Sequence, residues 1–150
     1  MSHTAARSFD RILEAAEVSC ADAGETLTPL RRNVLELLWK REGPAKAYDL
    51  LDELKLGHPG AKPPTIYRAL EFLVRLGLAH RIESLNAFIA CDLGSCARSM
   101  VFLICDQCGA TVEVDAGHAL EDMQAAARAS GFALARTVIE ASGVCARCQA

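Results

Sequence analysis

The stretch from Gly57 to Gly77, GHPGAKPPTIYRALEFLVRLG, decides how the first half of this chain folds. Its glycines and prolines interrupt any regular element before residue 63, and Pro63 and Pro64 suit the start of a helix. Beyond them, apolar or small residues recur at helical spacing on one side, namely Ile66, Leu70, Leu73 and Gly77. The sequence therefore predicts a helix over residues 65–77 whose opposite, polar side is free to meet a partner.

Short helices precede this stretch, and a hairpin follows it. Helical patterns cover residues 8–24, 28–43 and 46–54, and Ser8 and Thr28 are expected as N-caps of the first two. The run LAHRIESLNAFIACD, residues 78–92, contains two strand-like segments around the turn-prone SLN. Helices followed by a hairpin in this order predict a winged helix-turn-helix, whose last helix places its N-terminal turn in the DNA major groove.

The residues of that turn are the candidate DNA contacts, namely Lys62, Thr65, Tyr67 and Arg68. A local charge surplus supports this choice, because residues 25–81 contain ten Lys/Arg against seven Asp/Glu, whereas residues 84–150 contain four against seven. Alternatively, Tyr67 packs in the core and Arg68 pairs with a surface acid. Spacing alone leaves both interpretations open.

The second half has another pattern: strand-like SMVFLIC, ATVEV and FALARTVIEA, with the helical segment GHALEDMQAAARASG before the last strand. This β-β-α-β order predicts a three-stranded sheet covered by one helix. One sheet face would stay bare and would suit a second copy of the chain. Residues 100–104 and 132–138 are expected near that dimer interface.

Composition restricts the class of protein. The 150 residues are 51% hydrophobic, enough to form cores, and the net charge of -3 argues against indiscriminate nucleic-acid binding. No apolar run approaches the roughly 20 residues of a membrane span, and the start lacks a secretory signal, so a cytoplasmic location is expected. Seven cysteines in a reducing compartment are not expected to form a disulfide framework.

Four of the cysteines form two C-x2-C pairs, Cys105 with Cys108 and Cys145 with Cys148. Two such pairs of thiolates are typical of a tetrahedral structural zinc site. Because 36 residues separate the pairs, the metal would join the C-terminal region to the end of the first strand of its domain. A redox dithiol is the alternative, but it requires a single C-x-x-C in a thioredoxin-like context.

These elements define the predicted fold class, which is α+β. We expect a winged helix-turn-helix DNA-binding domain over residues 1–84. A small α/β dimerisation domain with the structural zinc is expected over residues 85–150.

With these residues in place, the chain resembles the ferric-uptake-regulator superfamily, most closely its zinc-uptake-regulator branch. The resemblance runs from about Ala16 to Cys148 and rests on LTPLR, AYDLLD, AKPPTIYRALEFL, HRIES, FLICDQCGATVE, GFAL and VIEASGVCARC. It implies a zinc-loaded homodimer, not an enzyme, that binds palindromic operators in double-stranded DNA and represses zinc-uptake genes. It also adds Arg31 to the candidate DNA contacts, although Leu30 replaces the usual glutamine.

The resemblance further implies a regulatory zinc site at His80, Cys91 and Glu113, and therefore two zinc ions per subunit. A histidine is expected between Cys91 and the first C-x2-C pair, and the sequence has none there. Cys96, five residues after Cys91, is the candidate fourth ligand, with Asp92 or water as the alternative. The soft thiolate ligands favour zinc over manganese or ferrous iron.

Other interpretations of these residues remain open. Taken one at a time, His80 fits a surface histidine, Cys91 a small buried apolar residue and Glu113 a solvent-facing strand residue. One alternative function is a regulator of the same superfamily that responds to another metal. A second is a thiol-dependent redox protein with Cys91 or Cys96 as nucleophile, although no oxyanion motif accompanies them. A third is a zinc-containing interaction module without a DNA partner.

Overall fold

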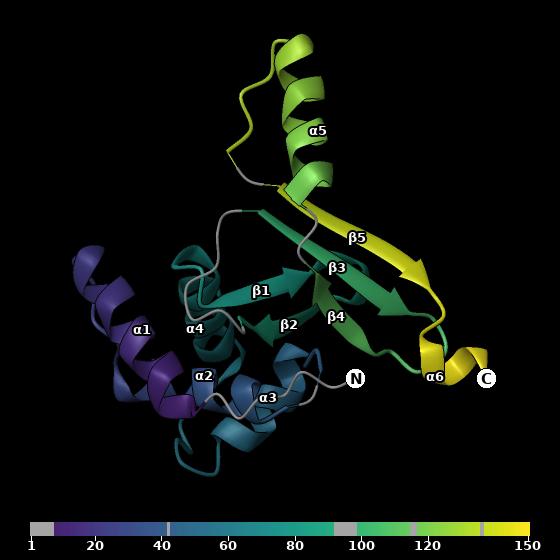
Figure 1. The fold of residues 1–150 in the computed structure, drawn as a ribbon. Helices are drawn as coiled ribbons and strands as arrows, with labels where there is room; N and C mark the ends of the chain where they lie inside the picture. Colours follow the sequence, from purple (N-terminus) through teal and green to yellow (C-terminus); the bar gives the residue numbers. More distant parts are fainter. Residues whose placement is uncertain (1–7, 42, 92–98, 115–116, 136) are drawn as a thin grey trace. The chain divides into compact units, whose positions relative to one another are not determined.

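The computed structural model describes residues 8–41, 43–91, 99–114, 117–135 and 137–150 (Figure 1). The chain divides into two compact units, Met1–Cys96 and Ala97–Ala150. This division falls later than the expected boundary after residue 84. The reason is that the strands on either side of residue 84 pair with each other, which keeps both in the first unit.

Helices open the first unit: α1 (Phe9–Asp22), α2 (Pro29–Lys40), α3 (Ala47–Leu54) and α4 (Pro63–Arg75). Both predicted N-caps are confirmed. The hydroxyl of Ser8 accepts from the Asp10 N–H at 3.2 Å, and that of Thr28 accepts from the Arg31 N–H at 3.4 Å. Each cap satisfies a backbone donor that a helix start otherwise leaves unpaired.

α4 packs against the other helices through the apolar side that the sequence predicts. Ile66, Leu70 and Leu73 are fully or almost fully buried, together with leucines of α2 and α3. The helix begins at Pro63, two residues before the predicted start, because the hydroxyl of Thr65 accepts from the Lys62 N–H at 3.0 Å and closes the first turn. Gly77 then ends the helix with a positive φ of 73°.

The predicted hairpin follows α4 as strands β1 (Ala79–Ile82) and β2 (Ala87–Ala90), joined by the short 3-10 helix η1 (Glu83–Leu85). They pair antiparallel, with Ala79 opposite Ala90 and Ile82 opposite Ala87. Ala45, in the connection before α3, adds an antiparallel bridge to Phe88. Helices followed by this wing give the winged helix-turn-helix order.

The second unit contains a three-stranded sheet in the order β4-β3-β5. β3 (Ser99–Cys105) pairs antiparallel with β4 (Thr111–Val114) and parallel with β5 (Thr137–Gly143). The last strand starts five residues later than FALARTVIEA predicts. Phe132 instead belongs to the end of the preceding helix, where its N–H donates to the Ala127 carbonyl at 2.8 Å.

The helices of the second unit are α5 (Gly117–Ala129) and the short α6 (Ala146–Gln149). The expectation that a helix covers the sheet was wrong for the single chain, because α5 carries no buried side chain among its described residues. Large apolar side chains of this unit stay exposed, namely Leu103, Val112, Met123, Phe132, Leu134 and Val144. None of the helices in the described part of the chain has the length and hydrophobicity that a bilayer-spanning segment requires.

Candidate metal centre and nucleic-acid interface

Both C-x2-C pairs lie at the same end of the second unit's sheet. Cys105 is the last residue of β3, and Cys145 lies two residues after the end of β5, as the N-cap of α6. Because β3 and β5 are parallel neighbours, with Cys105 opposite Gly143, the two pairs meet. The four sulfurs lie within 4.8 Å of one another, and we call Cys105, Cys108, Cys145 and Cys148 the cysteine cluster.

The spacing inside the cysteine cluster fits a metal site. All four residues are free thiols, and the Cys108 and Cys145 sulfurs are 3.7 Å apart. Tetrahedral coordination with Zn–S bonds of about 2.3 Å places neighbouring sulfurs about 3.8 Å apart. The all-sulfur donor set and this separation therefore suit zinc, whereas a disulfide joins its sulfurs at about 2.05 Å.

Hydrogen bonds from backbone N–H groups and from neighbouring side chains give the thiols of the cluster different pKa values. The Cys145 N–H donates to Cys105 Sγ at 3.4 Å, and with a contribution from the Cys108 N–H it lowers the pKa of Cys105 to about 6. The Ala110 N–H lowers the pKa of Cys108. Side-chain hydrogen bonds with Cys145 and Cys108 favour the neutral thiol of Cys148 and raise its pKa to about 12. A dication shared by the four sulfurs favours the thiolate form of each.

One further residue, which the sequence pattern did not predict, lies at the cysteine cluster. Arg147 Nη2 donates to Cys108 Sγ at 3.8 Å. The only feature of the sequence that could have indicated this contact is the position of Arg147 between the two cysteines of the second pair.

The predicted regulatory ligands fall in both units. His80 lies in β1 with 4% of its surface exposed, so the interpretation as a surface histidine was wrong. Cys91 directly follows β2, and its N–H donates to the Leu78 carbonyl at 3.0 Å, which brings it to the same end of the hairpin as His80. Glu113 lies in β4 of the second unit and is half-buried. Cys96 lies outside the described residues.

The state of Cys91 bears on its predicted role. Its side chain is buried, as the small apolar interpretation expects, with 1% exposed. It is also disulfide-bonded, an exception to the expectation of reduced cysteines. Only the reduced form offers a thiolate to a metal.

The predicted DNA contacts of α4 lie on its exposed side. Lys62 and Arg68 are exposed, Thr65 is half-buried, and Tyr67 is 38% exposed. The alternative with Tyr67 in the core is therefore wrong. Within the described part of the chain no acidic side chain forms an ion pair with Arg68, which also removes the surface-pair alternative for that residue.

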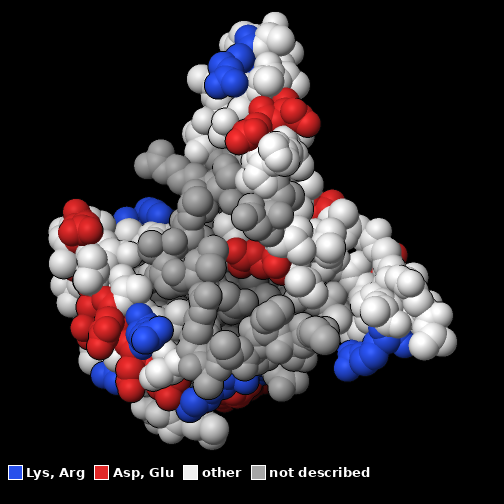
Figure 2. Space-filling model, in the orientation of Figure 1, with Lys and Arg blue, Asp and Glu red and all other residues white. Residues whose placement is uncertain are grey.

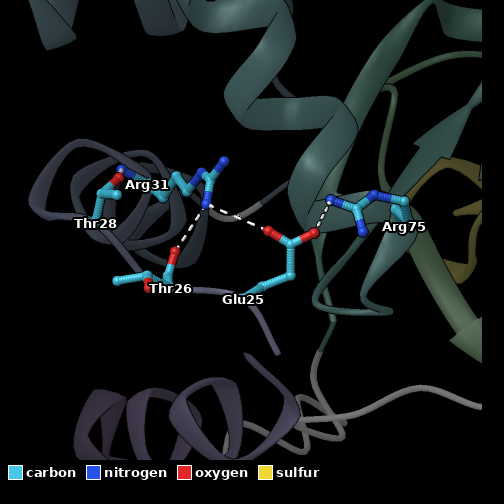
Figure 3. Close-up of polar contacts among 5 residues, drawn as sticks. All are labelled: Glu25, Thr26, Thr28, Arg31 and Arg75. Atoms are coloured by element: carbon cyan, nitrogen blue, oxygen red, sulfur yellow. Dashed lines mark hydrogen bonds and ion pairs between the residues drawn. The ribbon is translucent and has the colours of Figure 1, made fainter. Parts of the chain in front are cut away.

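Arg31 has a different environment from the α4 residues (Figure 3). Its Nη1 donates to the Thr26 carbonyl at 2.8 Å and lies 4.0 Å from a Glu25 carboxylate oxygen. Its guanidinium also stacks over the Phe72 ring at 3.7 Å. The other Glu25 oxygen pairs with Arg75 at 3.0 Å, so one carboxylate connects α2 with the end of α4. Arg31 thus stabilises helix packing.

Charge on the visible face of the molecule is mixed. Figure 2 shows Lys/Arg and Asp/Glu side chains interspersed over the helices of the first unit. No broad surface of one sign covers that face. This mixed charge therefore fits nucleic-acid binding through a few specific residues better than binding through a wide basic patch.

Comparisons with known proteins match most of the chain. Residues 22–142 match the sequence model of the Ferric uptake regulator family. The Zinc uptake regulation protein of Escherichia coli (strain K12) is 44% identical over 138 residues, which cover 91% of this chain and 81% of that protein.

Solved structures agree with these matches. A structure described as "Zinc Uptake Regulator Complexed With Zinc AND DNA" has a TM-score of 0.86 at 42% identity and covers 94% of each chain. The crystal structure of holo XcZur has a TM-score of 0.83 at 40% identity and covers 95% of this chain and 99% of its own.

Proposed function

The chain belongs to the ferric uptake regulator family, and on that premise we propose that it is a zinc-responsive, DNA-binding repressor of zinc-uptake genes. The observation that carries the proposal is its likeness, over nearly the whole chain, to a zinc uptake regulator solved with zinc and DNA. The family and the fold class predicted from the sequence are confirmed. The family is one of regulators, and the protein is not an enzyme.

The cysteine cluster is the proposed structural zinc site. Four free thiols within 4.8 Å of one another support this assignment. Zinc bound there would neutralise part of the thiolate charge. Bound to one ion, the four cysteines would hold the end of β5 and α6 against the end of β3. This would link two parts of the chain that are far apart in sequence, because Cys105 and Cys145 are 40 residues apart.

A second, regulatory zinc is proposed at His80, Cys91, Cys96 and Glu113, which gives two ions per subunit. The burial of His80 and its place beside Cys91 at one end of the wing support this ligand set, provided that Cys91 is reduced. Because the ligands come from both units, zinc bound by all of them would favour one relative orientation of the units. That dependence on orientation would make DNA binding respond to zinc.

Cys96 can be tested separately. We expect Cys96→Ser to keep the structural zinc and the dimer but to need much more free zinc to bind its operator. A cobalt-substituted regulatory site should also lose part of its thiolate charge-transfer absorption. If the zinc response and the cobalt spectrum both equal those of the parent, an oxygen ligand such as Asp92 or water completes the site.

DNA recognition is assigned to the first turn of α4, with Lys62, Thr65, Tyr67 and Arg68 as contacts. In a homodimer, two copies of this helix would read the two halves of a palindrome. Arg31 remains a candidate for a phosphate contact only through the part of its guanidinium not held by Glu25. A cytoplasmic location follows from this role, because the operator DNA lies there.

A gel-shift titration tests the function as a whole. The reduced protein is mixed with DNA from its own promoter region, with zinc, manganese or ferrous iron, or with a chelator. We expect a discrete complex that requires zinc and is lost with the chelator. A complex that forms best with another metal would instead support a different sensor of the same family, and absence of any specific complex would contradict DNA binding.

A further inference from the structure

Arg147 lies between two members of the cysteine cluster, Cys145 and Cys148, so their backbone positions limit where its side chain can go. Its Nη2 donates to Cys108 Sγ at 3.8 Å, across from its own C-x2-C pair. A guanidinium has only donors and stays charged, so Arg147 cannot itself be a metal ligand. It can act only through the thiolates.

A cation beside the cysteine cluster would offset negative charge there. Four thiolates around a divalent metal carry a net charge of -2, and Cys108 is exposed to solvent. The neighbouring Asp106 is also exposed and adds negative charge. The cations among the described residues of the second unit are Arg128 and Arg147, and Arg128 lies in the last turn of α5, outside the cluster.

We propose that Arg147 is a positioning residue of the tetrathiolate centre, which slows both loss of the metal and attack of electrophiles on Cys108. A hydrogen bond from a charged donor draws electron density from the sulfur and makes it a weaker nucleophile. The positive charge offsets part of the surplus negative charge of the centre. This inference rests on the proposed structural zinc.

The experiment uses the full-length, zinc-loaded protein in reducing buffer. The variants are Arg147→Ala and, as the matched control, Arg128→Ala, which removes the same charge elsewhere in the same unit. Zinc transfer to a coloured chelator gives the rate of metal loss, and iodoacetamide labelling followed by peptide mass spectrometry gives the reactivity of Cys108. Removing an outer-shell partner typically costs 10–100-fold in metal affinity, so we expect Arg147→Ala to lose zinc roughly tenfold faster.

Cobalt gives a readout that a loss of folding stability alone would not move. In the folded, cobalt-loaded protein, loss of the hydrogen bond to Cys108 should shift the sulfur-to-cobalt charge-transfer band to lower energy. Arg128→Ala should keep the rate, the labelling and the spectrum of the parent. If Arg147→Ala does not fold, Arg147→Gln, which keeps a polar side chain but is shorter and uncharged, is measured in its place by the same criteria.

The outcomes separate this inference from the proposed function. A parent protein that holds no zinc on the cysteine cluster contradicts the proposed metal centre itself. A parent that holds zinc tightly, with a variant of Arg147 that matches it in rate and spectrum, overturns only the role of Arg147. Equal acceleration by Arg128→Ala also overturns it, because the effect would then follow net charge rather than the contact with Cys108.

Discussion

At the scale of single residues, the two arginines predicted to meet DNA differ in what already holds them. Arg68 is exposed on α4 and has no acidic partner among the described residues. Arg31 is held by Glu25, Thr26 and Phe72. We therefore expect the two side chains to contribute to different properties, and each can be measured.

Arg68→Ala should weaken operator binding by about 1–3 kcal/mol, the usual range for an arginine-to-base contact. Fluorescence anisotropy with labelled operator, at fixed salt and saturating zinc, measures this loss. Sedimentation should show an unchanged dimer. The control Arg128→Ala removes the same charge from the second unit and should bind as the parent does. An Arg68→Ala protein with parental affinity would exclude this residue from base recognition.

Arg31→Ala should lower the stability of the first unit by about 1 kcal/mol, because it removes a stacked cation and a hydrogen bond at a partly exposed site. Urea unfolding followed through Trp39, the one tryptophan of the chain, reports on this unit. The neighbouring Arg32, which is exposed, provides the control Arg32→Ala. A large loss of operator affinity with unchanged stability would show instead that Arg31 serves DNA binding.

At the scale of elements, the end of β5 and α6 depend on the cysteine cluster. α6 has four residues, too few for a helix to persist alone. Among the strands of the described residues, β5 pairs with β3 alone. Metal bound at the proposed site would therefore provide much of the free energy that orders this part of the second unit.

Cys148→Ser should consequently abolish the folded dimer, not merely the zinc response. Circular dichroism and sedimentation measure the loss, and prolonged strong chelation of the parent should reproduce it slowly. Cys20→Ala, which removes a thiol from the core of the first unit, is the control and should keep its zinc and its dimer. A folded, dimeric and repressing Cys148→Ser protein would show that the second C-x2-C pair is dispensable.

The elements that sequence predicts best are those set by nearby residues. The caps at Ser8 and Thr28 and the apolar side of α4 are local patterns, and the structure has them as expected. The start of β5 was misplaced because a glycine-terminated helix end extends to Phe132. The pairing of Arg75 with Glu25 was missed because it depends on how the end of α4 meets the segment before α2, which no local pattern encodes.

The candidate sites also contain features set by nearby residues and features that depend on how distant segments meet. The spacing within each C-x2-C pair predicts two metal ligands. The parallel ladder of β3 and β5 brings the two C-x2-C pairs together. The contact of Arg147 with Cys108 joins residues 39 apart and could not be read from spacing. The regulatory ligands belong to two units, so their meeting stays a prediction.

At the scale of the whole molecule, the exposed apolar residues of the second unit call for a partner. Phe132 is 68% exposed, and Leu103 and Met123 are 46% exposed. Exposed large apolar side chains gathered in one small unit indicate an interface. A second copy of the chain would also supply the cover that α5 does not give to its own sheet.

Phe132→Glu should therefore shift the protein toward monomer, because a carboxylate in an apolar interface would be buried without a partner. Analytical ultracentrifugation of the zinc-loaded protein at micromolar concentration measures the shift. Leu56→Glu is the control, since Leu56 is 87% exposed but belongs to the first unit. Two variants that dimerise equally well would place the interface away from Phe132.

The parallel pairing of β3 with β5 also determines the order in which the two units can fold during translation. At about 5–20 residues per second, a ribosome needs roughly 2–8 s to add the 40 residues that separate Cys105 from Cys145. In that interval β3 and β4 can form only a two-stranded hairpin, which is marginal in water. The winged helix-turn-helix, whose residues are already synthesised, can fold while the ribosome adds the residues of β5 and α6. The second unit can bind zinc through all four cysteines of the proposed site only after Cys148 has left the exit tunnel. The proposed DNA-binding helix would therefore mature before the proposed zinc site.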